Sequence, residues 1–153
     1  SSDVCSSDLR LGGTVDRIDA KDTTLRIVDY KTGGSPKTPA NIEQLFTPSE
    51  SRPNYIFQTF LYAAIMSRQQ SLKVAPSLLY IHRAASESYS PVIEMGEPRQ
   101  PKIPVSNFAF FEDEFREHLQ RLLEEIFDKN EPFTQTEDTK KCAYCDFKAI
   151  CKR

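Results

Sequence analysis

Residues 12–33, GGTVDRIDAKDTTLRIVDYKTG, constrain the fold more than any other stretch of the chain. They contain a weaker apolar run at 13–18 and a stronger one, rich in branched side chains, at 25–30. A polar connection at 20–23 separates the two runs. Short apolar runs joined by a polar turn are typical of a β-hairpin. The stretch predicts two antiparallel strands.

Two acids and a lysine are expected on one face of this hairpin. A turn centred on Asp22 and Thr23 would place Asp16 opposite Asp29, about 5 Å away, where like charges repel. Lys31 projects from the same face as Asp29 because side chains alternate along a strand. A hard divalent cation, Mg²⁺ or Mn²⁺, is the simplest counter-charge for two carboxylates. Such a trio suits phosphodiester hydrolysis, although an ordinary surface hairpin with chance acids is the alternative.

The clearest helix is expected over residues 54–70, NYIFQTFLYAAIMSRQQ. Asn54 follows a proline and is a plausible N-cap, and apolar residues recur at helical spacing. Gln58 and Tyr62 are four positions apart and so lie on one helix face. A tyrosine on an amphipathic helix is usually a core residue, so this pair alone is a weak signal.

Further elements complete an α/β pattern. Residues 75–83 predict a strand, residues 88–95 a partner strand that extends the sheet, and residues 111–129 a second long helix. The expected architecture is a small mixed β-sheet flanked by α-helices. Residues 34–53 are polar and proline-rich, which predicts a loop or flap.

Lys37 and Arg52 in the expected flap are candidates for contacts with a DNA backbone, and solvated loop charges are the alternative. The net charge is −2 and the pI about 5.7, so the composition carries no global basic signature. A local cationic channel would still be enough to contact phosphates.

Cys142, Cys145 and Cys151 form a C-x2-C-x5-C pattern in KKCAYCDFKAICKR. Thiolates at such spacing can converge on a metal that needs a fourth ligand, and spacing alone favours Zn²⁺. Cys5 is the only other cysteine in the sequence. It lies in the serine-rich residues 1–10, which are expected to be a disordered or non-native lead to a single domain at 11–153.

Taken together, these motifs resemble the PD-(D/E)XK nucleases, and more narrowly the branch with the RecB and AddB nuclease domains. G-T-V-D ends at Asp16, D-Y-K spans Asp29 to Lys31, and Q-x-x-x-Y is Gln58 with Tyr62. The resemblance implies a restriction-endonuclease-like core. Asp16, Asp29 and the Tyr30 carbonyl would hold the metal, Lys31 would assist attack by water, and Gln58 and Tyr62 would position DNA or the lysine.

The cysteine tail resembles the [4Fe-4S] staple of AddB-type nucleases, in which three C-terminal cysteines join one far upstream. This implies a DNA nuclease joined to a helicase domain or partner subunit, acting in double-strand break repair and recombination. CRISPR-associated adaptation nucleases share the motifs and are one alternative, and a non-catalytic DNA-binding or structural module is another. The related nucleases carry a further metal ligand on an upstream helix for which this chain has no room, so a truncated C-terminal fragment is expected.

No apolar run approaches the roughly 18 residues of a membrane span, and no signal-peptide pattern is present. We therefore expect a soluble, cytoplasmic protein without a membrane partner.

Overall fold

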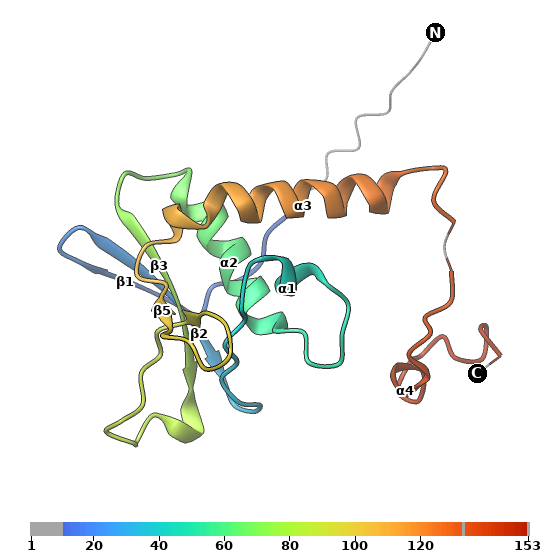
Figure 1. Cartoon of the computed structure of the whole chain (residues 1–153), viewed down its shortest axis with the longest axis horizontal. Coiled ribbons are helices and arrows are strands. Elements are labelled where there is room, and N and C mark those ends of the chain that lie inside the picture. The colour runs from blue at the N-terminus through green and yellow to red at the C-terminus, as the bar shows by residue number, and fades with distance from the viewer. Residues whose placement is uncertain (1–10, 133, 153) are drawn as a thin grey trace, which may run out of the picture. The chain divides into compact units, whose positions relative to one another are not determined.

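The computed structural model of the chain describes residues 11–132 and 134–152 (Figure 1). The chain divides into two compact units, Ser1–Arg121 and Leu122–Arg153. The expected lead at 1–10, with Cys5, lies outside the described residues. The single domain expected at 11–153 stays a prediction. No helix in the described part of the chain is long and apolar enough to cross a membrane.

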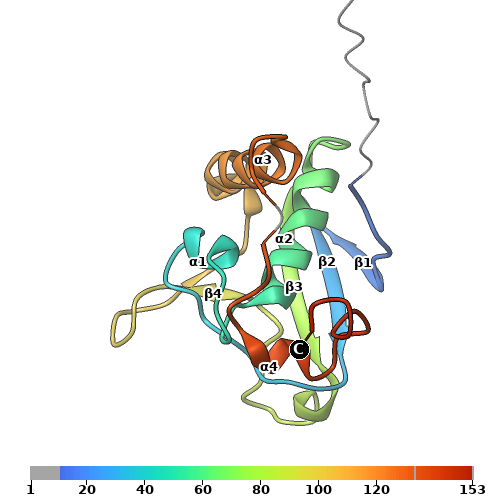
Figure 2. The same cartoon turned by 90° about the vertical axis from the view of Figure 1, so that its right-hand side faces the viewer.

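A three-stranded sheet with the order β1-β2-β3 forms the centre of the first unit. Strand β1 (Arg17–Lys21) pairs antiparallel with β2 (Thr24–Lys31), and β3 (Lys73–Tyr80) pairs parallel with β2 (Figure 2). The predicted mixed sheet is confirmed. Within the hairpin, Arg17 lies opposite Val28 and Lys21 opposite Thr24, which is the register that a turn centred on Asp22 and Thr23 predicts. Asp22 accommodates this turn with a left-handed φ of 53°.

Helix α2 (Asn54–Ser67) connects the parallel strands and packs beside β2 and β3 (Figure 2). It was expected over 54–70 with Asn54 as the cap. Instead, Pro53 occupies the N-cap position without a side-chain hydrogen bond, and Asn54 is already helical. Proline is compatible with a helix start because it has no N–H that needs a partner.

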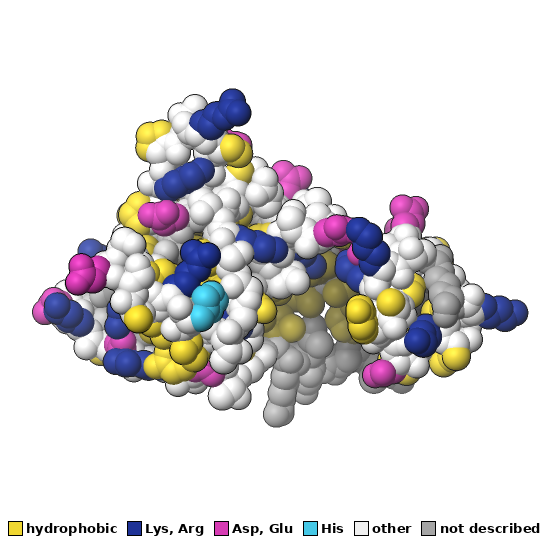
Figure 3. Space-filling model, turned by 90° about the horizontal axis from the view of Figure 1, so that it is seen from below, with side chains coloured by type: hydrophobic (Ala, Val, Ile, Leu, Met, Phe, Trp, Pro, Cys, Tyr) yellow, Lys and Arg dark blue, Asp and Glu magenta, His cyan; other side chains and the backbone are white. Residues whose placement is uncertain are grey.

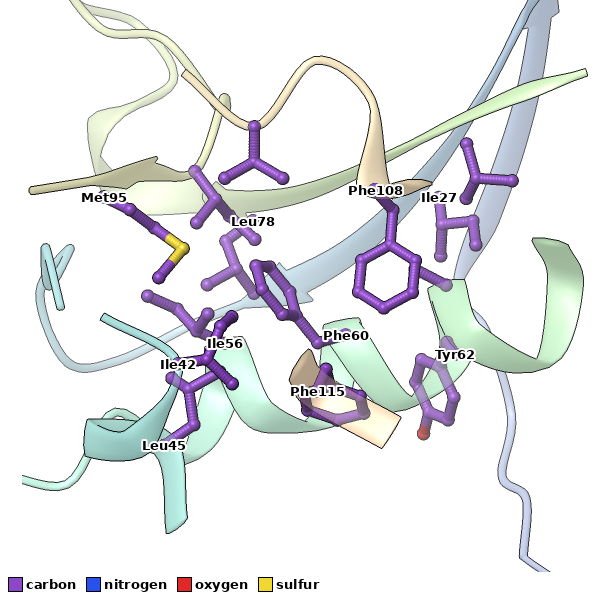
Figure 4. Close-up of a cluster of buried hydrophobic side chains, with 14 of the residues drawn as sticks. Ile27, Ile42, Leu45, Ile56, Phe60, Tyr62, Leu78, Met95, Phe108 and Phe115 are labelled. Carbon is purple, nitrogen blue, oxygen red and sulfur yellow. The ribbon is translucent and has the colours of Figure 1, made fainter. Parts of the chain in front are cut away.

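Aromatic side chains join the helices to the sheet in an apolar core (Figure 4). Phe60 of α2, Phe108 of a 3₁₀ turn (Phe108–Phe110) and Phe115 of α3 (Glu112–Phe127) are fully buried. The Phe60 and Phe108 rings meet edge-on with centroids 5.3 Å apart. Edge-to-face pairs of this kind add about 0.5–1.5 kcal/mol each to the free energy of burial. The second long helix is therefore anchored through its N-terminal turns.

The segment at 34–53 is more structured than expected. It contains the short helix α1 (Glu43–Phe46), and Ile42 and Leu45 are buried in the core. The Phe46 ring packs edge-on against Phe57 of α2, with centroids 5.2 Å apart. A flap over the whole segment is wrong, because two aliphatic side chains fix its middle to the core.

The expected hairpin between 75–83 and 88–95 is also wrong in most of its length. β3 ends at Tyr80, and β4 (Glu94–Met95) pairs instead with β5 (Ile103–Pro104) in a separate two-stranded sheet. Beside β3 there is one isolated bridge, Ser77 with Val92. The Tyr89 hydroxyl accepts from the Tyr80 N–H and donates to the Leu78 carbonyl, both at 2.8 Å. It thus satisfies backbone groups of β3 that a neighbouring strand would otherwise pair. Proline at 91 cannot supply an N–H to a regular ladder.

The second unit consists of the C-terminal part of α3, the short helix α4 (Thr139–Cys142) and a series of turns. Asp138 caps α4 by accepting from the Lys140 N–H at 3.2 Å. Gln135 donates to the Cys151 carbonyl at 3.2 Å and holds the last turn. None of the residues that the structure describes in this unit is buried, and local hydrogen bonds organise them.

Candidate active site

The C-terminal end of β2 buries a carboxylate next to a lysine. The Asp29 residue is only 3% exposed, and its Oδ2 lies 2.5 Å from the Lys31 Nζ. The strand places both side chains on one face because they are two positions apart, as the sequence predicted. Burial of a charge is costly unless it is paired, so the position of each group depends on the other.

Helix α2 contributes the next two polar groups. The Gln58 Oε1 accepts from the Lys31 Nζ at 3.1 Å, and the Gln58 Nε2 donates to the Tyr62 hydroxyl at 2.9 Å. One helix face carries both side chains, and that face lies against the end of β2. The structure thus brings together four of the predicted residues in a continuous polar network, which runs from Asp29 through Lys31 and Gln58 to Tyr62.

Tyr55 is a member of this network that the sequence reasoning missed. Its ring lies under the Lys31 Nζ, which is 4.2 Å from the ring centroid. The signal was present in the sequence, because Tyr55 is three positions before Gln58 and so falls on the same helix face. Without the fold, nothing distinguished it from the other aromatic residues of α2.

Gly13, the glycine of the G-T-V-D motif, lies so close to Tyr62 that no larger residue fits there. A Cβ built on Gly13 would lie 2.5 Å from the Tyr62 hydroxyl oxygen, closer than any side chain tolerates. The backbone at Gly13 therefore passes directly over the tyrosine at the end of the network. A methyl group on Gly12, by contrast, would meet nothing within 4 Å.

Asp16 lies beside the same strand end, just before the first residue of β1. Its side chain is exposed, and Oδ2 accepts from the Tyr30 N–H at 2.7 Å. This hydrogen bond places the carboxylate next to the peptide that joins Asp29 to Tyr30. The paired ladder begins at Arg17. The hairpin register, continued by one residue, would place Asp16 opposite Asp29, but Asp16 lies outside the regular pairing.

These oxygen atoms fit a hard cation. Asp29 Oδ2 is buried and forms no hydrogen bond, so only the charge of Lys31 compensates it. Mg²⁺ typically binds through one or two carboxylates and completes its octahedron with water and substrate phosphates. Asp29, Asp16 and the Tyr30 carbonyl match that chemistry. Among residues 11–132 and 134–152, no group of three or more His, Cys, Asp and Glu side chains is assembled for a metal.

Lys37 and Arg52 have intramolecular roles in the structure. Lys37 Nζ donates to the carbonyls of Ser51 and Arg52 at 2.8 and 3.1 Å. Arg52 Nε donates to the Leu45 carbonyl at 2.7 Å, and its guanidinium lies 5.1 Å from the Phe57 ring centroid. Both cations thus bind backbone carbonyls within the 34–53 segment. Their contact with DNA stays a prediction.

A pocket of about 240 Å³ adjoins the network, with Lys37, Arg52, Tyr55 and Tyr80 among its lining residues. Burial raises the pKa of the Tyr80 phenol, and the neighbouring Tyr89 and Tyr55 raise it further. Tyr80 is therefore a neutral hydrogen-bonding group near physiological pH. On the face of the molecule in Figure 3, basic side chains are interspersed with uncharged and acidic ones.

The three C-terminal cysteines are free thiols, each partly exposed. Cys142 donates weakly to the Asp138 carbonyl at 3.9 Å. In the described part of the chain, these thiols do not form a group of three or more metal-binding side chains. The predicted cluster with Cys145 and Cys151 stays a prediction.

Comparison with known proteins places the chain in a family. The family model of the PD-(D/E)XK nuclease superfamily matches residues 2–152. No curated protein and no solved structure matches the chain. The match covers the hairpin, α2 and the cysteine tail, and the mixed sheet with its helices is consistent with the restriction-endonuclease-like core that the resemblance implied. The chain belongs to the PD-(D/E)XK nuclease superfamily.

Proposed function

We propose that this chain is the nuclease domain of a metal-dependent deoxyribonuclease that hydrolyses phosphodiester bonds. The observation that carries the proposal is the contact of Lys31 with Asp29 and Gln58 at 2.5 and 3.1 Å. A fixed cation beside carboxylate oxygens suits a reaction in which negative charge develops on a phosphoryl group. Superfamily membership supports the same reaction class.

Each residue has a proposed task. Asp16, Asp29 and the Tyr30 carbonyl would hold Mg²⁺ or Mn²⁺, which would supply Lewis-acid chemistry by lowering the pKa of a bound water and polarising the phosphoryl oxygen. Lys31 would orient the attacking water and offset developing charge. Gln58 fixes the lysine, and Tyr62 fixes the amide of Gln58, so that the network holds the ammonium in one place.

The test is cleavage of single-stranded and double-stranded DNA with Mg²⁺ or Mn²⁺. Lys31→Ala should lower the rate by about 10²–10³, as expected when one preorganised charge-stabilising group is removed. The control is Lys73→Ala, which removes an exposed lysine at the start of β3 and should leave cleavage unchanged.

Removal of Lys31 leaves the buried Asp29 unpaired, so the fold of each variant is checked by circular dichroism. Lys31→Arg keeps the charge but replaces the compact ammonium with a planar guanidinium. It should fold and still cleave slowly. Full activity in a folded Lys31→Ala protein would refute the assignment of the lysine, whereas DNA binding without cleavage by the wild-type protein would favour the non-catalytic module.

The biological setting that we propose is a helicase–nuclease in double-strand break repair and recombination, on the strength of the RecB-like and AddB-like motifs. A CRISPR-associated adaptation nuclease is the alternative, because it would use the same motifs. Lys37 and Arg52, which line the pocket beside the network, are proposed to contact the DNA backbone. Co-purification of a helicase subunit with the tagged native protein would separate the two settings.

A [4Fe-4S] cluster is proposed at Cys142, Cys145 and Cys151, with Cys5 as the candidate fourth ligand and Zn²⁺ as the alternative metal. Three thiolates in one short tail support it, since soft thiolate sets select iron–sulfur clusters or zinc.

A further inference from the structure

The Lys31 ammonium carries a full positive charge and three N–H groups, and the structure places three partners around it: an ion-pair partner, a hydrogen-bond acceptor and an aromatic ring. The Asp29 Oδ2 lies at 2.5 Å and the Gln58 Oε1 at 3.1 Å. The Tyr55 ring is the third, with its centroid 4.2 Å from Nζ. An aromatic face attracts an ammonium through its quadrupole, and the attraction is largest where water is excluded. The first two partners, Asp29 and Gln58, belong to the family motifs, and Tyr55 does not.

Tyr55 also separates the lysine from solvent. The Lys31 side chain is 14% exposed, although it lies at the end of a strand, whereas Tyr55 is 41% exposed. The ring therefore bears the solvent contact that the lysine would otherwise have. Such an arrangement desolvates the ammonium and strengthens its pairing with Asp29.

The backbone around Tyr55 limits how far the ring can move. Gly34 adopts a φ of +78°, and a Cβ on it would lie 3.3 Å from the Tyr55 Cε2. The chain leaving β2 therefore passes close to the ring edge. Within α2, the Thr59 hydroxyl donates to the Tyr55 backbone carbonyl at 2.7 Å.

We propose that Tyr55 is a positioning residue of the active site, and that its aromatic face holds the Lys31 ammonium in the orientation needed for attack. This inference rests on the proposed nuclease function. Without the ring, a long side chain would regain rotamer freedom and a water would replace the third partner. The motif that positions the lysine would then be Y-x-x-Q-x-x-x-Y along one face of α2.

The experiment compares Tyr55→Leu, which removes the aromatic face at similar size, with Tyr55→Phe, which keeps it. Two quantities are measured: the NMR shifts of the Lys31 Cε and Hε nuclei, assigned with Lys31→Arg, and the kcat and KM of DNA cleavage. Tyr144→Leu is the matched control, because Tyr144 is 95% exposed in the other unit.

Tyr55→Leu should abolish the ring-current shift of the Lys31 Hε protons and lower kcat about tenfold with little change in KM. Tyr55→Phe and Tyr144→Leu should retain both the shift and kcat. If Tyr55 only stabilised the fold, Tyr55→Leu would not change the Lys31 shifts selectively. Recovery of both the Lys31 shift and kcat in Tyr55→Phe would therefore identify the aromatic face as the feature that matters.

Unchanged Lys31 shifts in Tyr55→Leu would overturn the proposal without any reference to activity. A rise in KM at constant kcat would also overturn it, since the ring would then stack on a nucleobase instead. If the shifts behave as expected and no protein cleaves DNA, the Lys31–Tyr55 contact stands and the proposed function fails. The two failures are therefore distinguishable.

Discussion

The polar network at the end of β2 joins side chains that are far apart in the sequence, whereas the cysteine tail contains thiols that are close in the sequence but do not form a site in the described part of the chain. Lys31 and Gln58 are 27 positions apart, and their side chains meet at 3.1 Å. The three C-terminal cysteines are close in the sequence, yet they are not assembled as a metal site. Proximity along the chain therefore does not create a site by itself.

Packing accounts for the difference. Helix α2 turns Phe60 and Ala63 into the core, where both are completely buried, and this fixes the face that carries Gln58 and Tyr62. In the C-terminal unit, Phe147 and Ile150 are 67% and 78% exposed. Among the described residues of that unit, no comparable apolar burial fixes the thiols, and a metal would have to supply the energy that holds them together.

The largest expected effect comes from removing the core that supports the network. Phe60→Ala should lower the free energy of unfolding by about 3–5 kcal/mol because it leaves a cavity between three aromatic rings. Phe147→Ala in the C-terminal unit should change it by less than about 0.5 kcal/mol. Urea unfolding of both variants measures this difference, and equal losses would contradict the contrast between the two regions.

A methyl group added at Gly13 should disturb the polar network at Tyr62. Gly13→Ala drives a Cβ into the Tyr62 hydroxyl and should cost about 1–3 kcal/mol of stability. Cleavage should fall as the Gln58–Tyr62 hydrogen bond is displaced.

Gly12→Ala is the matched control for this substitution, since its Cβ meets no atom within 4 Å. It should retain both stability and cleavage. Equal behaviour of the two alanine variants would mean that the backbone does not approach Tyr62 as closely as the structure shows.

Measurement of bound iron and zinc tests whether the cysteine tail holds a metal. If the proposed cluster forms, protein purified without oxygen should contain iron, and replacement of Cys142, Cys145 and Cys151 by serine should remove it. The same replacement in metal-free protein should change the melting temperature little, because the thiols are partly exposed. Zinc in place of iron would support the alternative metal, and no bound metal would refute both.

The smallest effect is expected on the exposed face of the hairpin. Hydrogen bonds from Arg26 and Arg17 lower the pKa of Asp19, which lies opposite Arg26 in the β1–β2 ladder. A lowered carboxyl pKa stabilises the fold above the unfolded pKa of about 3.9, and the gain is lost as pH falls through the lower folded value.

Asp19→Asn should therefore reduce the melting temperature slightly at pH 7 and have no effect once the pH is below the folded pKa of Asp19. Melting curves from pH 7 to strongly acidic buffer test this. A difference that grows on acidification would have the wrong sign for this ion pair.

Local patterns determined much of the molecule. Two short apolar runs and a polar turn predicted the β1–β2 hairpin and its register, although the first strand, expected at 13–18, lies at Arg17–Lys21. Helical spacing predicted α2 and α3 within a few residues. The alternation of side chains along a strand placed Asp29 and Lys31 on one face. These features depend on interactions between near neighbours, which the sequence contains explicitly.

Only the tertiary structure decided which distant side chains share an environment. It showed that β2 pairs with β3, that the Tyr89 hydroxyl replaces an expected strand, and that Ile42 and Leu45 hold a supposed flap. It also put Tyr55 under the lysine and Gly13 over Tyr62. Such contacts follow from how the whole core packs, and no local period of the sequence encodes them.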